Sequence, residues 1–203
     1  MKMLSFTLGD EIPCPDPFTQ FDSWYRHRLS LNLPVPESMS LGTMSETGVS
    51  IRTVLLKGYD NNGFVFFTNY LSRKGKQLEI NNSAALLFFW PETLQQVRIE
   101  GSVIKVTEEE SDKYFMSRPL ESRIGAWASE QSSKIPGMKY LEERFEKYKS
   151  DFKNKTVDRP AHWGGYRLLP VWFEFWKEGK HRLHHRVSYT LDNNTWLMEQ
   201  LAP

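Results

Sequence analysis

Residues 50–69 read SIRTVLLKGYDNNGFVFFTN, and this stretch decides the fold class. Residues 50–60 are expected to form a strand with a buried end, and residues 64–69 form its partner, because both runs have the composition of strands. Between them, Asp60-Asn61-Asn62-Gly63 is typical of a hairpin turn, since Asn and Gly tolerate positive φ. The stretch therefore predicts two neighbouring antiparallel strands.

Further strands are predicted on both sides of this hairpin. Residues 38–46 alternate weakly, and residues 93–106 alternate over a length that indicates one long strand. Residues 84–90, AALLFFW, are apolar throughout, as in a strand buried on both faces. The C-terminal part predicts three strands at residues 165–177, 181–191 and 195–201, with turns at residues 178–179 and 192–194.

Helices are predicted between these strands. Asp16 and Pro17 are typical of an N-cap and a first helical residue, so a helix should continue to about residue 31. Ser72 should cap a short helix over residues 73–82, and a capping box at Thr107 starts another that Pro119 ends. Residues 122–133 predict a helical turn running into a loop, and residues 138–152 an amphipathic helix.

This arrangement predicts a mainly β protein, with helices inserted into an antiparallel barrel. A flexible N-terminal arm over residues 1–15 should precede a single domain over residues 16–203. No strand is followed by a G-x-G-x-x-G or G-x-x-x-x-G-K-[ST] motif, which argues against a Rossmann or P-loop nucleotide site.

The composition excludes several function classes. The net charge is +1, so the global balance favours neither a nucleic acid nor an anionic membrane as partner. Cys14 is the single cysteine and fits a reducing compartment. The N-terminus resembles no signal peptide, and no apolar run approaches membrane-spanning length. We therefore expect a cytoplasmic enzyme.

Residues 52–74 contain two clusters of cations. On a strand, Arg52 and Lys57 would point to opposite faces, and Lys57 by itself could simply extend to water. Arg73 and Lys74 stand in the first turn of the helix capped by Ser72, where a cation is unfavourable unless an anion is bound. We therefore interpret this helix start as a phosphate site, with a solvated charged turn as the alternative.

Two more clusters lie further along the chain. Tyr114 and Arg118 share a helix face, and with Ser122 they could hold a second phosphate, although such a pair is often surface packing. In residues 181–186, HRLHHR, strand alternation would place Arg182, His184 and Arg186 on one face. Three histidines there also raise a metal site, but alternation separates them and no Cys or nearby Asp completes a ligand set, so we expect no metal.

At these clusters the sequence resembles the pyridoxamine 5'-phosphate oxidase family. The similar strings include R-T-V-L-L-K from Arg52, S-R-K-G-K from Ser72, and a longer string from Tyr114 to Ser133, with W-G-G-Y and E-F-W-x-x-x-x-H-R-L-H later. They occur in the family's order from about Asp16 to Pro203. The resemblance implies a Greek-key split β-barrel and a homodimer that binds two FMN molecules in clefts at the subunit interface.

The resemblance also implies residue roles and a reaction. FMN would be bound by Arg52, Thr53, Val54, Leu55, Leu56, Lys57, Phe67, Thr68, Arg73, Lys74, Gln96, Gln131, Ser132, Trp176 and Arg186. The phosphorylated vitamin B6 substrate would contact Lys57, Tyr114, Arg118, Ser122, Arg182, Leu183 and His184, with Arg182 and His184 as the catalytic pair. The implied reaction oxidises pyridoxamine or pyridoxine 5'-phosphate with O2 to pyridoxal 5'-phosphate and H2O2.

The chain departs from the family pattern at three places. The segment before Asp16 lacks the family's arginine, the usual R-L-H-D-R has His185 in place of its acid, and the usual final R-L-A-P begins with Gln200. Three alternatives remain open: a flavin oxidase of the phenazine-biosynthesis type, a catalytically silent FMN or pyridoxal phosphate carrier, and a nucleic-acid-binding barrel, which the near-neutral charge disfavours.

Overall fold

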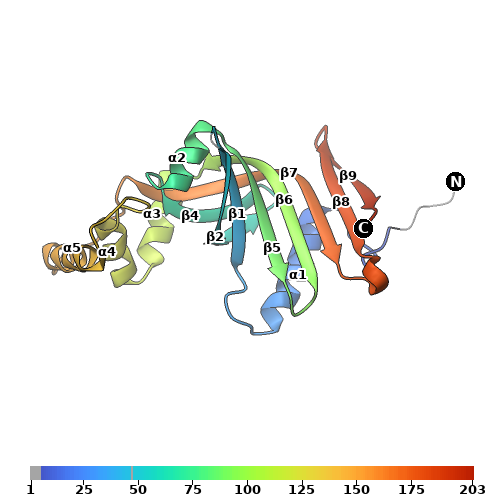
Figure 1. Cartoon of the computed structure of the whole chain (residues 1–203), viewed down its shortest axis with the longest axis horizontal. Coiled ribbons are helices and arrows are strands. Elements are labelled where there is room, and N and C mark those ends of the chain that lie inside the picture. Colours follow the sequence, from blue (N-terminus) through green and yellow to red (C-terminus); the bar gives the residue numbers. More distant parts are fainter. Residues whose placement is uncertain (1–5, 47) are drawn as a thin grey trace.

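The computed structural model describes residues 6–46 and 48–203. Within these residues the chain forms nine strands in one antiparallel sheet and five α-helices (Figure 1). The strands are β1 Ser38–Ser45, β2 Gly48–Leu55, β3 Gly58–Asp60, β4 Gly63–Asn69, β5 Ser83–Trp90, β6 Gln95–Lys105, β7 Trp163–Lys177, β8 His185–Asp192 and β9 Thr195–Leu201. The helices are α1 Pro17–Ser30, α2 Arg73–Ile80, α3 Glu108–Ser117, α4 Leu120–Ala128 and α5 Met138–Asp151.

The sheet runs in the order β2-β1-β5-β6-β7-β4-β3, and β8 and β9 continue it from β7. Its strand pairs are antiparallel, which confirms the mainly β class with inserted helices. No ladder joins β3 back to β2 in the part of the chain that the structure describes. The barrel is therefore open between these two strands.

The stretch over residues 50–69 forms the predicted turn but not one continuous hairpin. The tight turn is confirmed: Asp60 pairs with Gly63, where a Cβ would lie 1.9 Å from the Leu168 carbonyl oxygen. The strand before it is divided. The backbone N–H of Leu56 donates to the Glu37 oxygen beside β1, whereas that of Lys57 donates to Val65 in β4. The prediction of a single strand over residues 50–60 was therefore wrong, because the chain changes its pairing partner after Leu56.

The main core is unusually aromatic. Phe21 of α1 lies edge-on to Phe64 and Phe88, with ring centroids 4.9 and 5.1 Å apart. Trp24, one turn further along α1, packs on Phe175 of β7 at 5.3 Å. The predicted start of α1 is confirmed, since the Asp16 side chain accepts a hydrogen bond from the Thr19 N–H. Packing α1 against the sheet buries these rings and fixes the open barrel's shape.

Strand β5 is buried on one face only. Leu86, Phe88 and Trp90 point into the core, while Phe89 is 56% exposed. The expectation of burial on both faces was wrong, because buried residues alternate with exposed or partly exposed ones along β5, so that only one face packs into the core. The α4 helix is also longer than the expected single turn, since it begins directly after Pro119.

The N-terminal segment includes residues 1–5, which lie outside the described residues. From residue 6 onward the segment contacts the barrel: Leu8 is fully buried and the Tyr189 hydroxyl donates to the Cys14 carbonyl oxygen at 2.7 Å. Glu11 accepts hydrogen bonds from Trp24 Nε1 at 3.0 Å and from Lys177 Nζ at 2.7 Å. The domain boundary at residue 15 stays a prediction.

Helices α3, α4 and α5 form a second, smaller cluster beside the barrel (Figure 1). Its buried residues are Phe115, Ile124, Val157 and Trp163, and α5 contributes the half-buried Phe145 and Tyr148 of its predicted apolar stripe. Among the described residues, no helix combines the length and the apolar character needed to cross a bilayer.

Candidate functional site

The N-terminus of α2 gathers three cations. Ser72 caps the helix by accepting a hydrogen bond from the Gly75 N–H, and Arg73 and Lys74 follow in a first turn that carries no acid. Burial lowers the pKa values of Arg52 and Lys74, and a neighbouring like charge adds a smaller effect, from Arg73 on Arg52 and from Arg52 on Lys74. Like charges thus face one another at the electropositive end of a helix, which is the arrangement that an anion would stabilise.

Lys74 is held by neutral oxygens. Its Nζ donates to Gln131 Oε1 at 2.8 Å and to Thr68 Oγ1 at 3.1 Å. Burial, with a smaller effect from Arg52, lowers the pKa of Lys74 to about 8. The structure therefore brings together Thr68, Lys74 and Gln131. The family resemblance implied that all three bind FMN, although more than fifty residues separate Gln131 from the other two.

Arg52 is likewise fixed by uncharged groups. Its Nη1 donates to the Leu41 carbonyl oxygen and its Nη2 to Gln77 Oε1, both at 3.0 Å. Thr43 also accepts from Nη1 and donates to Gln77. Burial, together with Arg73, lowers the pKa of the Arg52 guanidinium. Thr43 and Gln77 were not predicted at the site, because nothing in their local sequence separates them from ordinary core polar residues.

An aromatic stack adjoins this cluster. Phe67 lies 4.0 Å from Tyr114 and 5.5 Å from Trp163, with all three rings nearly parallel. The Arg118 guanidinium lies over Trp163 at 4.7 Å. Its Nη1 is buried without a hydrogen-bond partner, and burial lowers the pKa of Arg118. A buried donor that lacks an acceptor is costly unless a ligand supplies one.

Lys57 and Tyr114 line one pocket of about 360 Å³ between β3, β4 and α3. Lys57 reaches Glu37 Oε1 at 3.7 Å, and Phe67 and Arg167 line the same pocket. Ser122 lies exposed in the first turn of α4, four positions after Arg118. Lys57 and Tyr114 therefore share a pocket with Phe67, and Arg118 adjoins the same aromatic stack through Trp163. Among the described residues no contact joins Ser122 to them.

A second group of the expected site residues lies on three neighbouring strands. Gln96 of β6 pairs with Trp176 of β7, which pairs with Arg186 of β8. Arg186 is held by Glu174, whose side chain is only 3% exposed and which also accepts from Arg98. Glu174 was missed by the sequence analysis. Its signal was a lone acid within the apolar run VWFEFW, where a carboxylate needs a buried partner.

The segment before β8 is not a strand. Residues 180–182 form a 3-10 turn in which His181 and Arg182 have φ of 58° and 63°, and β8 begins only at His185. The prediction that Arg182, His184 and Arg186 share one face of a strand was therefore wrong. The cause is Gly179, whose N–H donates to His184 Nδ1 at 3.3 Å and closes a tight loop.

Within this loop the expected residues are arranged differently. His184 lies 4.8 Å from the Trp176 ring, whereas Arg182 and Leu183 are exposed. Because Nδ1 accepts from the backbone, a neutral His184 ring carries its proton on Nε2. Residues 6–46 and 48–203 contain no group of three His, Cys, Asp or Glu that could hold a metal ion.

The two groups face opposite sides of the sheet. Arg52 pairs with the fully buried Leu41, so its side chain lies on the core side of the strand pair. Gln96 and Arg186 are each adjacent to a fully buried valine, so they point away from the core. In Figure 1, α2 lies to the left of β5 and β6 and β8 lies to their right, so the two groups are apart. One copy of the chain therefore does not close both groups around one ligand.

The other residues expected at the site lie around the first group. Thr53, Val54 and Leu55 continue β2 from Arg52, and Leu56 is buried directly after that strand. Ser132 follows Gln131 in the exposed loop between α4 and α5, with φ of 73°.

The chain matches known proteins over most of its length. Residues 30–150 match the family model described as pyridoxamine 5'-phosphate oxidase, and residues 163–203 match that of the pyridoxine 5'-phosphate oxidase C-terminal dimerisation region. A pyridoxine/pyridoxamine 5'-phosphate oxidase from Burkholderia thailandensis is 54% identical over 93% of this chain and 90% of its own length. One from Burkholderia mallei is 52% identical with the same coverage.

Solved structures show the same fold. PhzG from Burkholderia lata, in complex with tetrahydrophenazine-1-carboxylic acid, is 31% identical with a TM-score of 0.88, covering 94% of each chain. An FMN-binding protein from Nostoc punctiforme related to pyridoxamine 5'-phosphate oxidase has a TM-score of 0.73 at 17% identity, over 93% of this chain and 98% of its own. The expected split-barrel fold is thereby confirmed. The match to a dimerisation region also supports a homodimer.

Proposed function

The chain belongs to the pyridoxamine 5'-phosphate oxidase family, and we propose that it is an FMN-dependent oxidase that forms pyridoxal 5'-phosphate. Pyridoxine 5'-phosphate and O2 would give pyridoxal 5'-phosphate and H2O2. With pyridoxamine 5'-phosphate, one water would also be consumed and ammonia released. The proposal rests on two groups of cations, one suited to a cofactor phosphate and one to a substrate phosphate. Among the described residues, the three cations at the start of α2 and Arg118 form no ion pair, whereas Lys57 forms one with Glu37 at 3.7 Å.

The residues at the start of α2 fit the phosphate of FMN. Burial lowers the pKa values of Arg52 and Lys74, with smaller contributions from Arg73 and Arg52 respectively, and a bound dianion would offset both effects. Bound FMN would supply a two-electron acceptor. Thr68 and Gln131 would hold Lys74 in position through the hydrogen bonds described above.

The residues around Phe67 fit the substrate phosphate. Arg118 would donate its unpartnered Nη1 hydrogens to a phosphate oxygen, and Lys57 and Tyr114 would contribute from the neighbouring pocket. Ser122 would complete the set from α4. Binding the phosphate far from the reacting carbon would align the substrate ring, converting binding energy into orientation.

Arg182 and His184 would cover the substrate from the loop before β8. The Gly179 N–H fixes His184 with Nε2 free to donate a hydrogen bond to the oxygen or nitrogen substituent that reacts. Arg182 is exposed in this chain and would orient the same substituent. We assign both residues to substrate positioning near the reacting carbon.

A homodimer would complete the site. The group of Gln96, Trp176 and Arg186 faces away from the core, so a second copy would have to present it to the FMN held by Arg52, Arg73 and Lys74. The C-terminal dimerisation match, which contains both Trp176 and Arg186, supports this arrangement.

The test is oxygen uptake by the FMN-loaded protein with pyridoxine 5'-phosphate. We expect uptake with equimolar H2O2 and a yellow protein that releases FMN on denaturation. A colourless protein that takes up no added FMN would refute the cofactor assignment. FMN binding without H2O2 formation would instead indicate a silent carrier.

A phenazine-type oxidase is the second candidate, favoured by the TM-score of 0.88 to PhzG. Its ligand in that structure carries a carboxylate and a tricyclic body rather than a phosphate. Comparing turnover of tetrahydrophenazine-1-carboxylic acid with that of pyridoxine 5'-phosphate on one preparation separates the two. The uncompensated Arg118 leads us to expect the phosphorylated substrate.

A further inference from the structure

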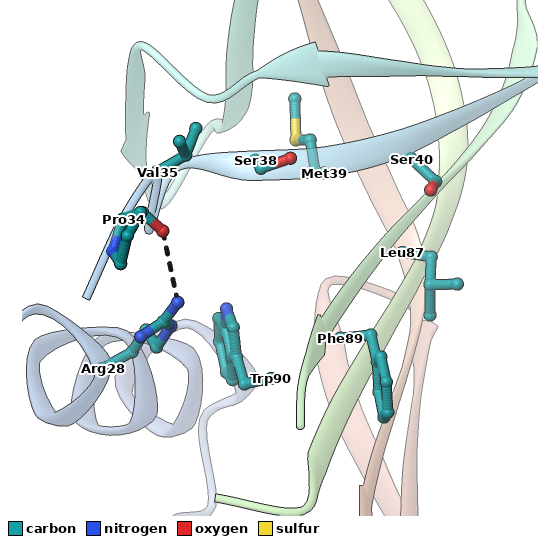
Figure 2. A pocket seen from close by; sticks show the side chains of 9 residues that line it. All are labelled: Arg28, Pro34, Val35, Ser38, Met39, Ser40, Leu87, Phe89 and Trp90. Atoms are coloured by element: carbon teal, nitrogen blue, oxygen red, sulfur yellow. Dashed lines mark hydrogen bonds between the residues drawn. The ribbon is translucent and has the colours of Figure 1, made fainter. Parts of the chain in front are cut away.

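Arg28, in the last turn of α1, is a buried cation with incomplete hydrogen bonding. The residue is 6% exposed, and its Nε and Nη1 have no partner. Its remaining nitrogen, Nη2, makes a long hydrogen bond of 3.4 Å to the Pro34 carbonyl oxygen (Figure 2). Its nearest carboxylate, Glu92, lies 3.9 Å from Nη2, beyond hydrogen-bonding distance.

Trp90 presents a second unpartnered donor at the same place. Its Nε1 is buried without an acceptor although the residue is only 2% exposed. Figure 2 shows the Arg28 guanidinium and the Trp90 ring nitrogen both directed toward the strand that carries Ser38. Three donor nitrogens from two side chains, Arg28 Nε, Arg28 Nη1 and Trp90 Nε1, therefore lack acceptors at one position.

An open pocket of about 330 Å³ adjoins these donors. Hydroxyls of Ser38 and Ser40 and the apolar side chains of Val35, Met39 and Leu87 line it, together with Phe89. None of its nine lining residues belongs to the proposed cofactor or substrate groups. The pocket therefore offers a polar, cationic end and an apolar wall of its own.

The helix end explains only part of this arrangement. A cation in the last turn of α1 is favourable because of the helix dipole, but that effect provides no acceptor for the three donor nitrogens. Burying a guanidinium without acceptors is unfavourable, and an anion would remove the penalty by pairing with the charge and accepting the hydrogen bonds.

We propose that Arg28 and Trp90 form a second ligand site, which binds a small amphiphilic anion. Its carboxylate or phosphoryl group accepts hydrogen bonds from Arg28 and from Trp90 Nε1. Its apolar body packs against Leu87, Phe89 and Val35. The pocket volume limits the ligand to about the size of one substituted aromatic ring.

The experiment uses FMN-loaded protein and three probes of one size: benzoate, phenyl phosphate and the neutral benzyl alcohol. We expect the preferred anion to raise the melting temperature of the wild type by about 2–4 °C at saturation. In Arg28→Met the same anion should raise it by less than half as much. Comparing the two proteins cancels any binding at the proposed substrate site, which both retain. Whichever of benzoate and phenyl phosphate gives the larger increase in melting temperature shows whether the site prefers a carboxylate or a phosphoryl group.

Trp90→Phe provides an independent measurement that keeps Arg28. We expect its affinity for the same anion to fall by about five- to tenfold, as for loss of one hydrogen bond, and the ligand-induced fluorescence change to be lost. Equal melting shifts in the wild type and Arg28→Met, or an equal shift with benzyl alcohol, would overturn the proposal. Unchanged affinity and fluorescence response in Trp90→Phe would also overturn it, even if Arg28→Met did not fold.

Discussion

Glu174 accepts two hydrogen bonds from Arg186, one from Nε and one from Nη2, each 3.0 Å long. Arg98 Nη1 donates to the same carboxylate at 3.1 Å. A single buried acid thus pairs with two arginines on the outer side of the sheet, one of which, Arg98, also pairs with Glu100 at 2.8 Å. It also fixes the Arg186 guanidinium next to Trp176, where the proposed FMN contact requires it.

Glu174→Gln should lower the free energy of unfolding by about 2–3 kcal/mol, because two guanidinium groups would face a neutral amide in a buried position. Urea unfolding monitored by fluorescence measures this change. Glu199→Gln is the control, since Glu199 is an exposed acid on the neighbouring β9, and it should change stability by less than about 0.5 kcal/mol. If the two substitutions lowered the free energy of unfolding equally, Glu174 would not have the stabilising role proposed for it.

FMN affinity should fall as the pH rises above 8. Without a bound anion the pKa of Lys74 is about 8, and a phosphate beside it would raise that value. Binding therefore requires proton uptake at pH values between the two pKa values, and affinity decreases there by up to about tenfold per pH unit. Lys74→Arg keeps its charge throughout, so its FMN dissociation constant should vary little between pH 7 and 9. Fluorescence titration of each apoprotein with FMN measures the dissociation constant of the wild type and of Lys74→Arg. If the two dissociation constants changed with pH in the same way, the assignment of Lys74 to the FMN phosphate would be contradicted.

Arg118→Ala should raise KM for pyridoxine 5'-phosphate by a factor corresponding to about 2–3 kcal/mol, with a smaller effect on kcat. The physical reason is the loss of a charge-assisted hydrogen bond to the phosphate. Arg123→Ala is the control, because Arg123 is a half-buried cation on α4 without a proposed substrate contact. Steady-state oxygen uptake gives both constants. A KM that does not change in Arg118→Ala would exclude Arg118 from the phosphate site.

Gly179→Ala should impair turnover without loss of FMN. A Cβ at this position would lie 1.9 Å from the Leu183 carbonyl oxygen, so the loop that carries Arg182 and His184 must move. A shift of about 1 Å at a positioning residue lowers kcat by about tenfold or more. Gly125→Ala is the control, because nothing lies within 4 Å of the added Cβ, and its kcat should match the wild type. Wild-type kcat in Gly179→Ala would show that the loop geometry is not needed.

Local signals were sufficient for most elements of the fold. The structure confirms the cap of α1 at Asp16, the cap of α2 at Ser72 and the turn at Asp60. Each of these features involves residues only a few positions apart in the sequence. The division after Leu56 was not predictable in the same way, since it depends on Glu37 and Val65 offering alternative pairing partners. The one-sided burial of β5 depends on what covers the sheet, which the strand's own composition does not encode.

The candidate site shows the same limit. Helix-end electrostatics predicted Arg73 and Lys74 as an anion site from their position alone. The contact between Lys74 and Gln131 joins distant segments and came only from family resemblance before the structure placed it. Alternation failed at His184 because the close approach of Gly179 to Leu183 replaces the strand with a turn.

The opposite orientation of Arg52 and Arg186 has a genetic consequence if two copies build each site. Lesions in the two groups would then fall into different complementation classes. A mixed dimer of an Arg52 variant and an Arg186 variant would carry one site with both defects and one with neither. Random reassortment of two inactive proteins should thus recover on the order of a quarter of the wild-type activity, whereas neither variant alone would recover any.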